Sequence, residues 1–418
     1  MPVASHETGP RDPSPRDPSP RPAPQRGFQV TEFEARLERA QRGMREAGID
    51  ALFLTTEPEI RYFSGFMTQF WESPTRPWFL VVPGHGKPIA VVPEIGASLM
   101  ASTWVDDVRS WPSPRPEDEG VTLLADALRD AVGDGATATS QASPVVGLLR
   151  GPETTLRMPL RDLDKLQNEL ADASFVDITD LISSLRMVKS EAEVDKIRHI
   201  CQVASDAFDQ LPSLVQADQS LSELFRRFRM ALLAAGADDV PYLVGACERD
   251  GYHDVISPPG ANTPQPGDIL MLDTGAKFDG YYCDFDRNYS IGPATDTLRR
   301  AHETLYAATE AGFNVARPGA TCDEIFNAMR NKIFDAGFAA GSIGRMGHGL
   351  GMQLTEWPSH RAGDQTVLRP GMVLTLEPEL MITEGRGIVH EENFVVREDG
   401  IEILSRRATK VLPEIHLS

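Results

Sequence analysis

The chain has 418 residues, 24% of them charged and 41% hydrophobic, a balance that predicts a folded protein of two domains. Its formal net charge of −20 at pH 7 argues against a nucleic-acid partner, because no basic excess is available to neutralise phosphates. No apolar run approaches about 18 residues, so we expect no membrane partner. Four cysteines without paired spacing and an N-terminus without an apolar signal core favour a cytoplasmic protein with reduced thiols.

The chain is expected to begin with a disordered tail, followed by an α/β domain. Residues 1–27 are rich in proline, arginine and serine and repeat RDPSP, a composition that predicts disorder. In residues 28–183, Thr31 and Glu34 match a capping box that would start the first helix. Apolar runs and helical periodicity predict strands at 51–54, 78–82, 88–92 and from 145, and helices at 31–47 and 120–132. This alternation predicts the α/β class.

Residues 184–418 are expected to form a second, α+β domain. Ser190 and Glu193 match a capping box ahead of a long amphipathic helix, and Thr321 and Glu324 match another. Further helices are predicted at 221–235, 297–316 and 322–336. The helices and the strand hairpins between them predict a duplicated helix-plus-hairpin unit with internal pseudo-symmetry.

Two segments of this second domain share one pattern, GDILMLD from Gly267 and GMVLTLE from Gly371. Each segment has an acid six residues after its glycine and a second acid beyond a glycine-containing turn. An acid that ends an apolar strand is costly to bury unless it is paired or bound to a metal. The acids are Asp273 and Asp284 in the first segment and Glu377 and Glu391 in the second.

Hairpin symmetry predicts that each pair of acids meets across neighbouring strands. Asp273 and Asp284 would face each other around a turn at Phe278–Asp279, and the second pair would face each other around Glu384. Four carboxylates in one pocket repel unless divalent cations neutralise them. His348 lies in a glycine-rich loop between the segments. This donor set suits Mn²⁺, Fe²⁺, Co²⁺ or Zn²⁺, with two ions about 3.5–4 Å apart.

With these residues the chain resembles the pita-bread metallopeptidase family, which includes prolidase, aminopeptidase P, methionine aminopeptidase and creatinase. EIRYFSGF (59–66) is similar to the family's N-terminal domain, and RMVKSEAEVDKIR (186–198) to the start of its catalytic domain. The resemblance implies a homodimer with a creatinase-like α/β domain before a pita-bread catalytic domain. It also implies that Asp273 binds one metal ion, that Asp284 and Glu391 bridge two, and that His348 and Glu377 complete the centre.

The implied activity is cleavage of an amide C–N bond in a dipeptide or small-molecule substrate, as in Xaa-Pro dipeptidases and aminopeptidases. Glu377 would accept a proton from the attacking water and pass it to the departing amine. His348 would act at the centre as a ligand. His253 lies where the family has a histidine that contacts the substrate or the leaving group, although its spacing from Asp273 is longer here.

Three positions depart from the proline-specific pattern. Thr355 stands where a second histidine is usual, Val389 where an arginine is usual, and Asp286 where a threonine is common. The departures affect groups that hold the peptide, so two alternatives stay open. One is a metal-dependent enzyme acting on a non-peptide metabolite, by hydrolysis or by elimination as in a dimethylsulfoniopropionate lyase. The other is a non-catalytic binding protein with the same fold.

Further substrate-binding candidates lie elsewhere in the chain. His360 and His390 could replace the missing histidine, or they could lie on the surface or behind the site. In the family, the N-terminal domain of a partner subunit reaches the active site. Trp71 or Arg76 would then cover the partner's pocket, unless the aromatic segment that contains them is simply core.

Overall fold

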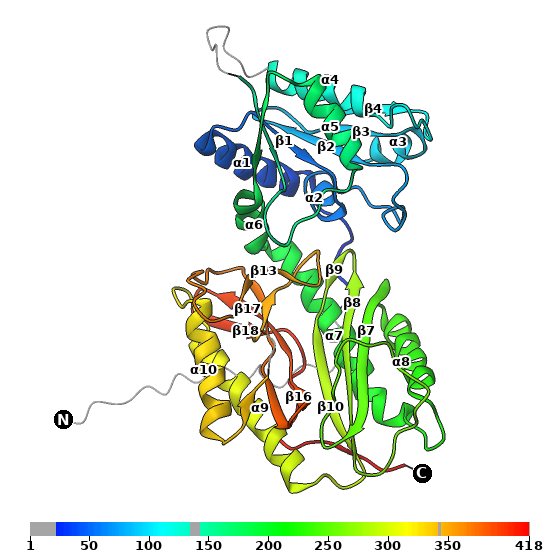
Figure 1. The fold of residues 1–418 in the computed structure, drawn as a ribbon, viewed down its shortest axis with the longest axis vertical. Helices are drawn as coiled ribbons and strands as arrows, with labels where there is room; N and C mark the ends of the chain where they lie inside the picture. Colours follow the sequence, from blue (N-terminus) through cyan, green and yellow to red (C-terminus); the bar gives the residue numbers. More distant parts are fainter. Residues whose placement is uncertain (1–21, 134–142, 342–343, 418) are drawn as a thin grey trace, which may run out of the picture. The chain divides into compact units, whose positions relative to one another are not determined.

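The computed structural model describes residues 22–133, 143–341 and 344–417, so most of the expected tail lies outside the described residues. The chain divides into two compact units at Arg186/Met187, where the sequence predicted a boundary at 183/184 (Figure 1). Both units contain helices and strands, which confirms the predicted fold class. None of the helices in the described residues combines the length and the apolar composition needed to cross a membrane.

The N-terminal unit is built on a six-stranded sheet in the order β4–β3–β2–β1–β5–β6. The strands are β1 (Ala51–Leu54), β2 (Phe79–Pro83), β3 (Ile89–Pro93), β4 (Asp107–Trp111), β5 (Val145–Leu148) and β6 (Ser174–Asp177). The helices are α1 (Val30–Ala47), α2 (Glu57–Ser64), α3 (Glu94–Met100), α4 (Val121–Gly133), α5 (Leu160–Glu169) and α6 (Thr179–Met187). Helix α4 contacts β1, β2 and β3, so its apolar side forms a core with them. This core explains why the strands read as continuous apolar runs.

Helix α1 begins differently from the prediction. Gln29 is the N-cap and makes no side-chain cap, so the capping box expected at Thr31 and Glu34 is wrong. The helix is instead held by the buried Arg36, whose Nη1 donates to the carbonyl oxygen of Tyr62 at 3.0 Å. Burial of one face of an amphipathic helix outweighs a missing cap, which is worth only about 1 kcal/mol.

The second unit contains three sheets between two pairs of helices. Their strand orders are β19–β10–β8–β7 with β9 beside β8, β13–β12–β14–β17–β18, and β11–β15–β16. Figure 1 shows α9 and α10 on one side of these strands and α7 and α8 on the other. The helices are α7 (Glu191–Leu214), α8 (Leu221–Ala235), α9 (Asp296–Val315) and α10 (Cys322–Asp335). The capping boxes predicted at the starts of α7 and α10 are confirmed.

Three of the predicted acids lie directly beside strand ends in this unit, whereas Asp273 lies in the middle of β8 (Asp268–Phe278). The strands are β7 (Asp239–Arg249), β8 (Asp268–Phe278), β9 (Tyr281–Tyr282), β10 (Phe285–Ile291), β11 (Ala339–Ala340), β12 (His348–Gly349), β13 (Glu356–Ser359), β14 (Val373–Leu376), β15 (Glu379–Thr383), β16 (Arg386–Val389), β17 (Glu392–Arg397), β18 (Gly400–Ile403) and β19 (Glu414–Ile415). Two strand pairs therefore decide where the carboxylates meet.

The first hairpin has a different register from the predicted one. Asp273 faces Asp286 across β8 and β10, so the expected direct pairing of Asp273 with Asp284 is wrong by two residues. The turn lies at Asp279–Gly280, both with positive φ, as a two-residue turn between right-twisted strands requires. A shift of two residues keeps side chains on the same face of the strand, so Asp284 stays on the side of Asp273.

The second hairpin has the predicted register. Leu376 pairs with Glu392 across β14 and β17, and Glu379 pairs with Val389 across β15 and β16. The same register places Glu377 opposite Glu391, between these two strand pairs, as the sequence predicted.

Candidate metal centre

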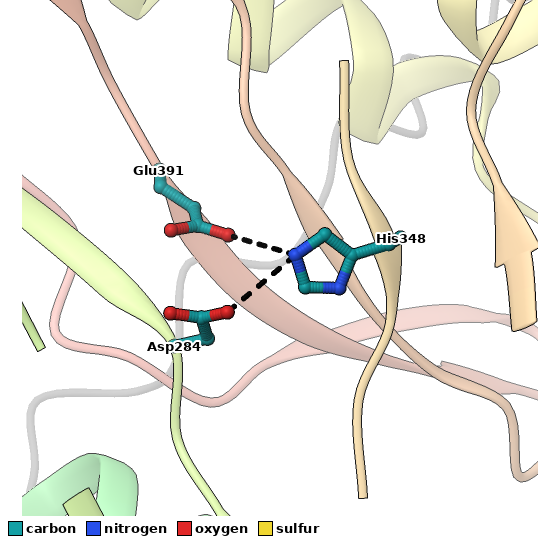
Figure 2. Close-up of side chains that lie close together, drawn as sticks. All are labelled: Asp284, His348 and Glu391. Atoms are coloured by element: carbon teal, nitrogen blue, oxygen red, sulfur yellow. Dashed lines mark ion pairs between the residues drawn. The ribbon is translucent and has the colours of Figure 1, made fainter. Parts of the chain in front are cut away.

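Three predicted ligands from distant parts of the chain meet in the second unit. The carboxylates of Asp284 and Glu391 point at the imidazole of His348 (Figure 2). The Nε2 atom of His348 lies 3.4 Å from Asp284 Oδ2 and 3.9 Å from Glu391 Oε1. All three side chains are buried. Ligand atoms of the three residues lie within 4.8 Å of one another, close enough to share one cation.

The hydrogen bond of His348 shows which ring nitrogen carries the proton and which has a free lone pair. Nδ1 lies 2.8 Å from the carbonyl oxygen of Gly349, and a carbonyl can only accept, so Nδ1 carries the proton. Burial and the nearby Arg345 guanidinium lower the pKa of His348 to about 4, which keeps the ring neutral at pH 7. The Nε2 lone pair and two carboxylates then face one another. The lone pair and the two carboxylates repel one another unless protons or a cation lie between them.

Asp273 and Glu377 belong to the same electrostatic group. Burial, and for Glu377 also the charge of Asp273, raises the pKa of Asp273 to about 7 and of Glu377 to about 8. Burial and these two acids raise the pKa of Asp284, and burial and the other three raise that of Glu391. The charge of Asp273 thus disfavours ionisation of the other three acids, as expected for carboxylates in one low-dielectric site.

The residues fit divalent metal ions. Asp273 Oδ1 and Glu391 Oε1 are buried atoms without a hydrogen-bond partner among the described residues. Oxygen donors with one imidazole nitrogen suit Mn²⁺, Fe²⁺, Co²⁺ or Zn²⁺. A positive charge at this position would satisfy the orphaned oxygens and favour the ionised form of all four acids.

Comparison with known proteins agrees with this geometry. The model of metallopeptidase family M24 matches residues 195–398, and that of the creatinase/prolidase N-terminal domain matches residues 36–188. The chain belongs to metallopeptidase family M24. It is therefore a metal-dependent hydrolase, as the sequence predicted.

The similar M24 proteins span nearly the whole chain. A probable dipeptidase PepE of Mycobacterium bovis is 27% identical over 90% of this chain and 95% of its own length. An Xaa-Pro dipeptidase of Lactobacillus delbrueckii subsp. lactis is 26% identical over 90% and 99%. The crystal structure of dipeptidase PepE from Mycobacterium ulcerans has a TM-score of 0.79 at 27% identity and covers 94% of this chain and 100% of its own.

Asn393 fixes the position of Asp284 in the M24 centre. Its side-chain oxygen accepts from the backbone N–H of Asp284 at 2.9 Å, and its Nδ2 donates to the carbonyl oxygen of the same residue. The thiol of Cys201 donates to the same Asn393 oxygen at 3.3 Å. Asp284 has no strand partner at this point, so the amide replaces a ladder partner. The amide also joins β17 to the segment before β10.

Asp286 supports the centre from behind. Its Oδ1 accepts from the backbone N–H of Glu391 at 2.7 Å, and its Oδ2 accepts from Asn288 Nδ2 at 3.1 Å. His390 lies between two acids, with Nδ1 3.6 Å from Asp286 Oδ1 and Nε2 3.3 Å from Glu392 Oε1. Although burial opposes it, Arg287 and His390 lower the pKa of Glu392 to about 2. His390 is thus enclosed in a buried charged network, and its predicted contact with substrate stays a prediction.

The remaining candidates in this unit have different surroundings. His253 is exposed, and its Nδ1 lies 2.6 Å from Glu248 Oε2. Val389 is buried, and its N–H donates to the hydroxyl of Tyr252 at 2.7 Å. His360 is fully buried, and burial and the neighbouring His348 lower its pKa to about 3. Thr355 is half-buried and lies beside Arg345. Their predicted roles in substrate binding stay predictions.

Trp71 and Arg76 lie in the N-terminal unit. The Trp71 ring packs against Phe66 and Trp78, with ring centroids 6.4 and 6.0 Å apart. The Arg157 guanidinium lies 5.4 Å from the centre of the Trp71 ring. Both candidates are half-buried, and the proposed contact of Trp71 or Arg76 with a partner subunit stays a prediction.

Two residues beside the centre escaped the sequence analysis. Tyr242 on β7 hydrogen-bonds Asp273, and burial together with all four acids raises its pKa. Arg345 acts electrostatically on Asp284 and Glu377. A signal existed for Arg345, because it lies three residues before His348 in the same loop. The position of Tyr242 depends on the pairing of β7 with β8, which no local pattern specifies.

Proposed function

We propose that the chain is a two-metal dipeptidase that hydrolyses the amide bond of dipeptides, with Xaa-Pro dipeptides as the first class to test. The observation that carries this proposal is the cluster of buried Asp284, His348 and Glu391, with the half-buried Asp273 and Glu377 in the same electrostatic group. Oxygens of Asp273 and Glu391 in this group have no hydrogen-bond partner among the described residues. Relatives named dipeptidase and Xaa-Pro dipeptidase, which match nearly the whole chain, support the substrate class.

Five side chains would hold the ions: Asp273, Asp284, His348, Glu377 and Glu391. Bound divalent ions supply a Lewis acid for the scissile carbonyl and lower the pKa of water at the site. The number and identity of the ions belong to the proposal. The tautomer of His348, fixed by Gly349, presents a free Nε2 lone pair to the centre. Asn393 and Asp286 hold Asp284 and Glu391 in place through their backbone groups.

Glu377 is the proton carrier in this proposal. In the metal-free chain, burial and Asp273 raise the pKa of Glu377 to about 8, so this carboxylate has a stronger tendency to accept a proton than an ordinary glutamate. It would take a proton from the attacking water and deliver it to the departing amine. Buried thiols in all four described cysteines, none of them in a disulfide, support the cytoplasmic location. The homodimer remains part of the proposal.

The test is hydrolysis of a dipeptide panel by protein loaded separately with Mn²⁺, Fe²⁺, Co²⁺ and Zn²⁺. The panel pairs Xaa-Pro with Xaa-Ala dipeptides, and released amino acid is measured by chromatography. We expect turnover that disappears in Asp284→Ala and Glu391→Ala together with bound metal. Full activity in either variant would overturn the centre. No turnover of any dipeptide by protein shown to contain metal would reject the dipeptidase and favour the non-peptide alternative, which the residues at Thr355 and Val389 motivated.

A further inference from the structure

We propose that Arg345, with Thr355 beside it, binds the free carboxylate of the dipeptide's C-terminal residue. This inference rests on the proposed dipeptidase function and names the group that selects a dipeptide. The Nη2 atom of Arg345 lies 3.4 Å from Thr355 Oγ1, and both side chains are half-buried, so solvent reaches them. A guanidinium and a hydroxyl side by side present several N–H donors and one O–H donor to a carboxylate.

Arg345 lies close to the metal-binding acids, because the carbonyl oxygen of the adjacent Met346 accepts a hydrogen bond from the backbone N–H of Glu377 at 3.0 Å. Burial and neighbouring acids raise the pKa values of Asp284 and Glu377, whereas the Arg345 guanidinium lowers both. The same positive charge helps to lower the pKa of His348. Arg345 is therefore near enough to anchor the end of a small substrate whose amide bond lies at the centre. Divalent ions would take over the neutralisation of the acids and leave the guanidinium available to a substrate anion.

The segment that carries Thr355 is firmly held. Glu356 Oε1 accepts from the backbone N–H groups of Met352 and Gln353 at 2.9 and 3.1 Å. Its Oε2 lies 2.9 Å from the Nζ of Lys189, and both side chains of this ion pair are buried. Because these contacts fix the loop, the Thr355 hydroxyl is held in one position, which lowers the entropy cost of binding.

Other candidates for this anchor are poorly placed. Val389 is apolar and buried, with its backbone groups bonded to Tyr252 and Asn288. His360 is fully buried, and His390 is enclosed between Asp286 and Glu392. Arg345 is a cation, and both Arg345 and Thr355 are partly exposed next to the centre. In this proposal the Arg345 guanidinium supplies the positive charge for the substrate carboxylate, and the Thr355 hydroxyl supplies a further hydrogen bond.

The competing explanation is that Arg345 only offsets the charge of the acids. A carboxylate anchor and a charge offset differ in how they affect a substrate with a free C-terminal carboxylate and one without it. A carboxylate anchor favours a dipeptide over its C-terminal amide, whereas a charge offset affects both substrates equally. Loss of one charge-assisted contact should change binding about 10- to 100-fold.

The experiment compares wild type, Arg345→Met, Arg345→Lys and Thr355→Val, with Arg361→Met as the matched control on the exposed surface of the same region. Each metal-loaded protein is assayed on Xaa-Pro and on Xaa-Pro amide, and the Kd for L-proline and for L-prolinamide is measured by calorimetry. Metal content and circular dichroism are measured for every variant.

We expect wild type and Arg361→Met to favour the free carboxylate. Arg345→Met should weaken proline binding and raise the KM for the dipeptide about 10- to 100-fold, with unchanged metal content and unchanged handling of the amide. Arg345→Lys should lose less, and Thr355→Val should lose a few-fold. If Arg345→Met does not fold, the Lys and Val variants carry the same comparison.

The outcomes separate this inference from the proposed function. Dipeptide hydrolysis with no preference for the carboxylate, equal losses on both substrates, or loss of metal in Arg345→Met would overturn the anchor and leave the dipeptidase standing. Proline binding that depends on Arg345 without any hydrolysis would support the anchor and reject the dipeptidase. Neither binding nor hydrolysis would reject both.

Discussion

Asp273→Asn in metal-free protein should remove the pH dependence that this acid imposes on stability. Burial raises the pKa of Asp273 from 3.8 to about 7 in the folded chain. Between these values the folded state binds a proton that the unfolded state has released. The contribution of Asp273 to stability is therefore full below pH 4 and is lost as the pH rises toward 7. Asparagine does not titrate, so the variant should keep its stability over this range.

The expected magnitude follows from the shift. Each pH unit between the unfolded and folded pKa values changes the free energy of unfolding by about 1.4 kcal/mol. From pH 5 to pH 7 the variant should gain about 3 kcal/mol relative to wild type. At about 2–4 °C per kcal/mol for a unit of this size, the difference in Tm should grow by roughly 6–12 °C. With metal bound the sign should reverse, because asparagine is a poorer ligand than a carboxylate.

The assay is thermal unfolding in EDTA at pH 5, 6, 7 and 8. Glu384→Gln, at the exposed turn between β15 and β16, removes a carboxylate outside the centre and serves as the control. Taking the difference from wild type cancels the opposing titration of the buried histidines, which both proteins share. A constant difference in Tm between Asp273→Asn and wild type across the four pH values would refute the argument that burial holds this acid protonated.

Three further outcomes are expected. Metal at about 100 times its Kd should add roughly 2.7 kcal/mol to wild type and nothing to Glu391→Ala, a contrast that scanning calorimetry measures. Lys189→Met should cost about 3–5 kcal/mol in urea unfolding, because it removes the ammonium group that forms a buried ion pair with Glu356; a loss below 1 kcal/mol would show that water reaches this acid. Tyr242→Phe should weaken metal binding about 10-fold, because it removes a hydroxyl that hydrogen-bonds Asp273; competition with a chelating dye would reveal an unchanged affinity if the hydroxyl is irrelevant.

The two hairpins show how far register can be predicted from sequence. The second was correct because Gly385 lies beside the predicted centre of its turn, and the acids fall symmetrically around it. The first was wrong because the turn was placed at Phe278–Asp279, although Asp279–Gly280 is the dipeptide that tolerates two positive φ angles. The correct rule was available in the residues. The dipeptide's preference for positive φ angles predicts the turn better than symmetric placement of the two acids around it.

The surroundings of the ligands could not be predicted from local pattern. Asn393 bonds to both backbone groups of Asp284 across a separation of 109 residues, and such a contact exists only once two sheets have packed. Tyr242 reaches Asp273 through the pairing of β7 with β8. Ligand residues are visible in sequence because their chemistry limits the residue type. Supporting residues are harder to find because many polar side chains can donate one hydrogen bond.

The metal ligands come from two sheets, which makes cation binding and contact between these sheets one event. Asp273 lies on β8, in the sheet with β10, whereas Glu391 directly precedes β17 in the other sheet. Without a cation the acids repel at this junction, and Asn393 opposes the repulsion with neutral hydrogen bonds worth about 1 kcal/mol each. Placing four buried and half-buried carboxylates at this junction therefore lowers the stability of the metal-free protein. The same arrangement raises cation affinity, because a bound cation that replaces protons removes the repulsion among these carboxylates.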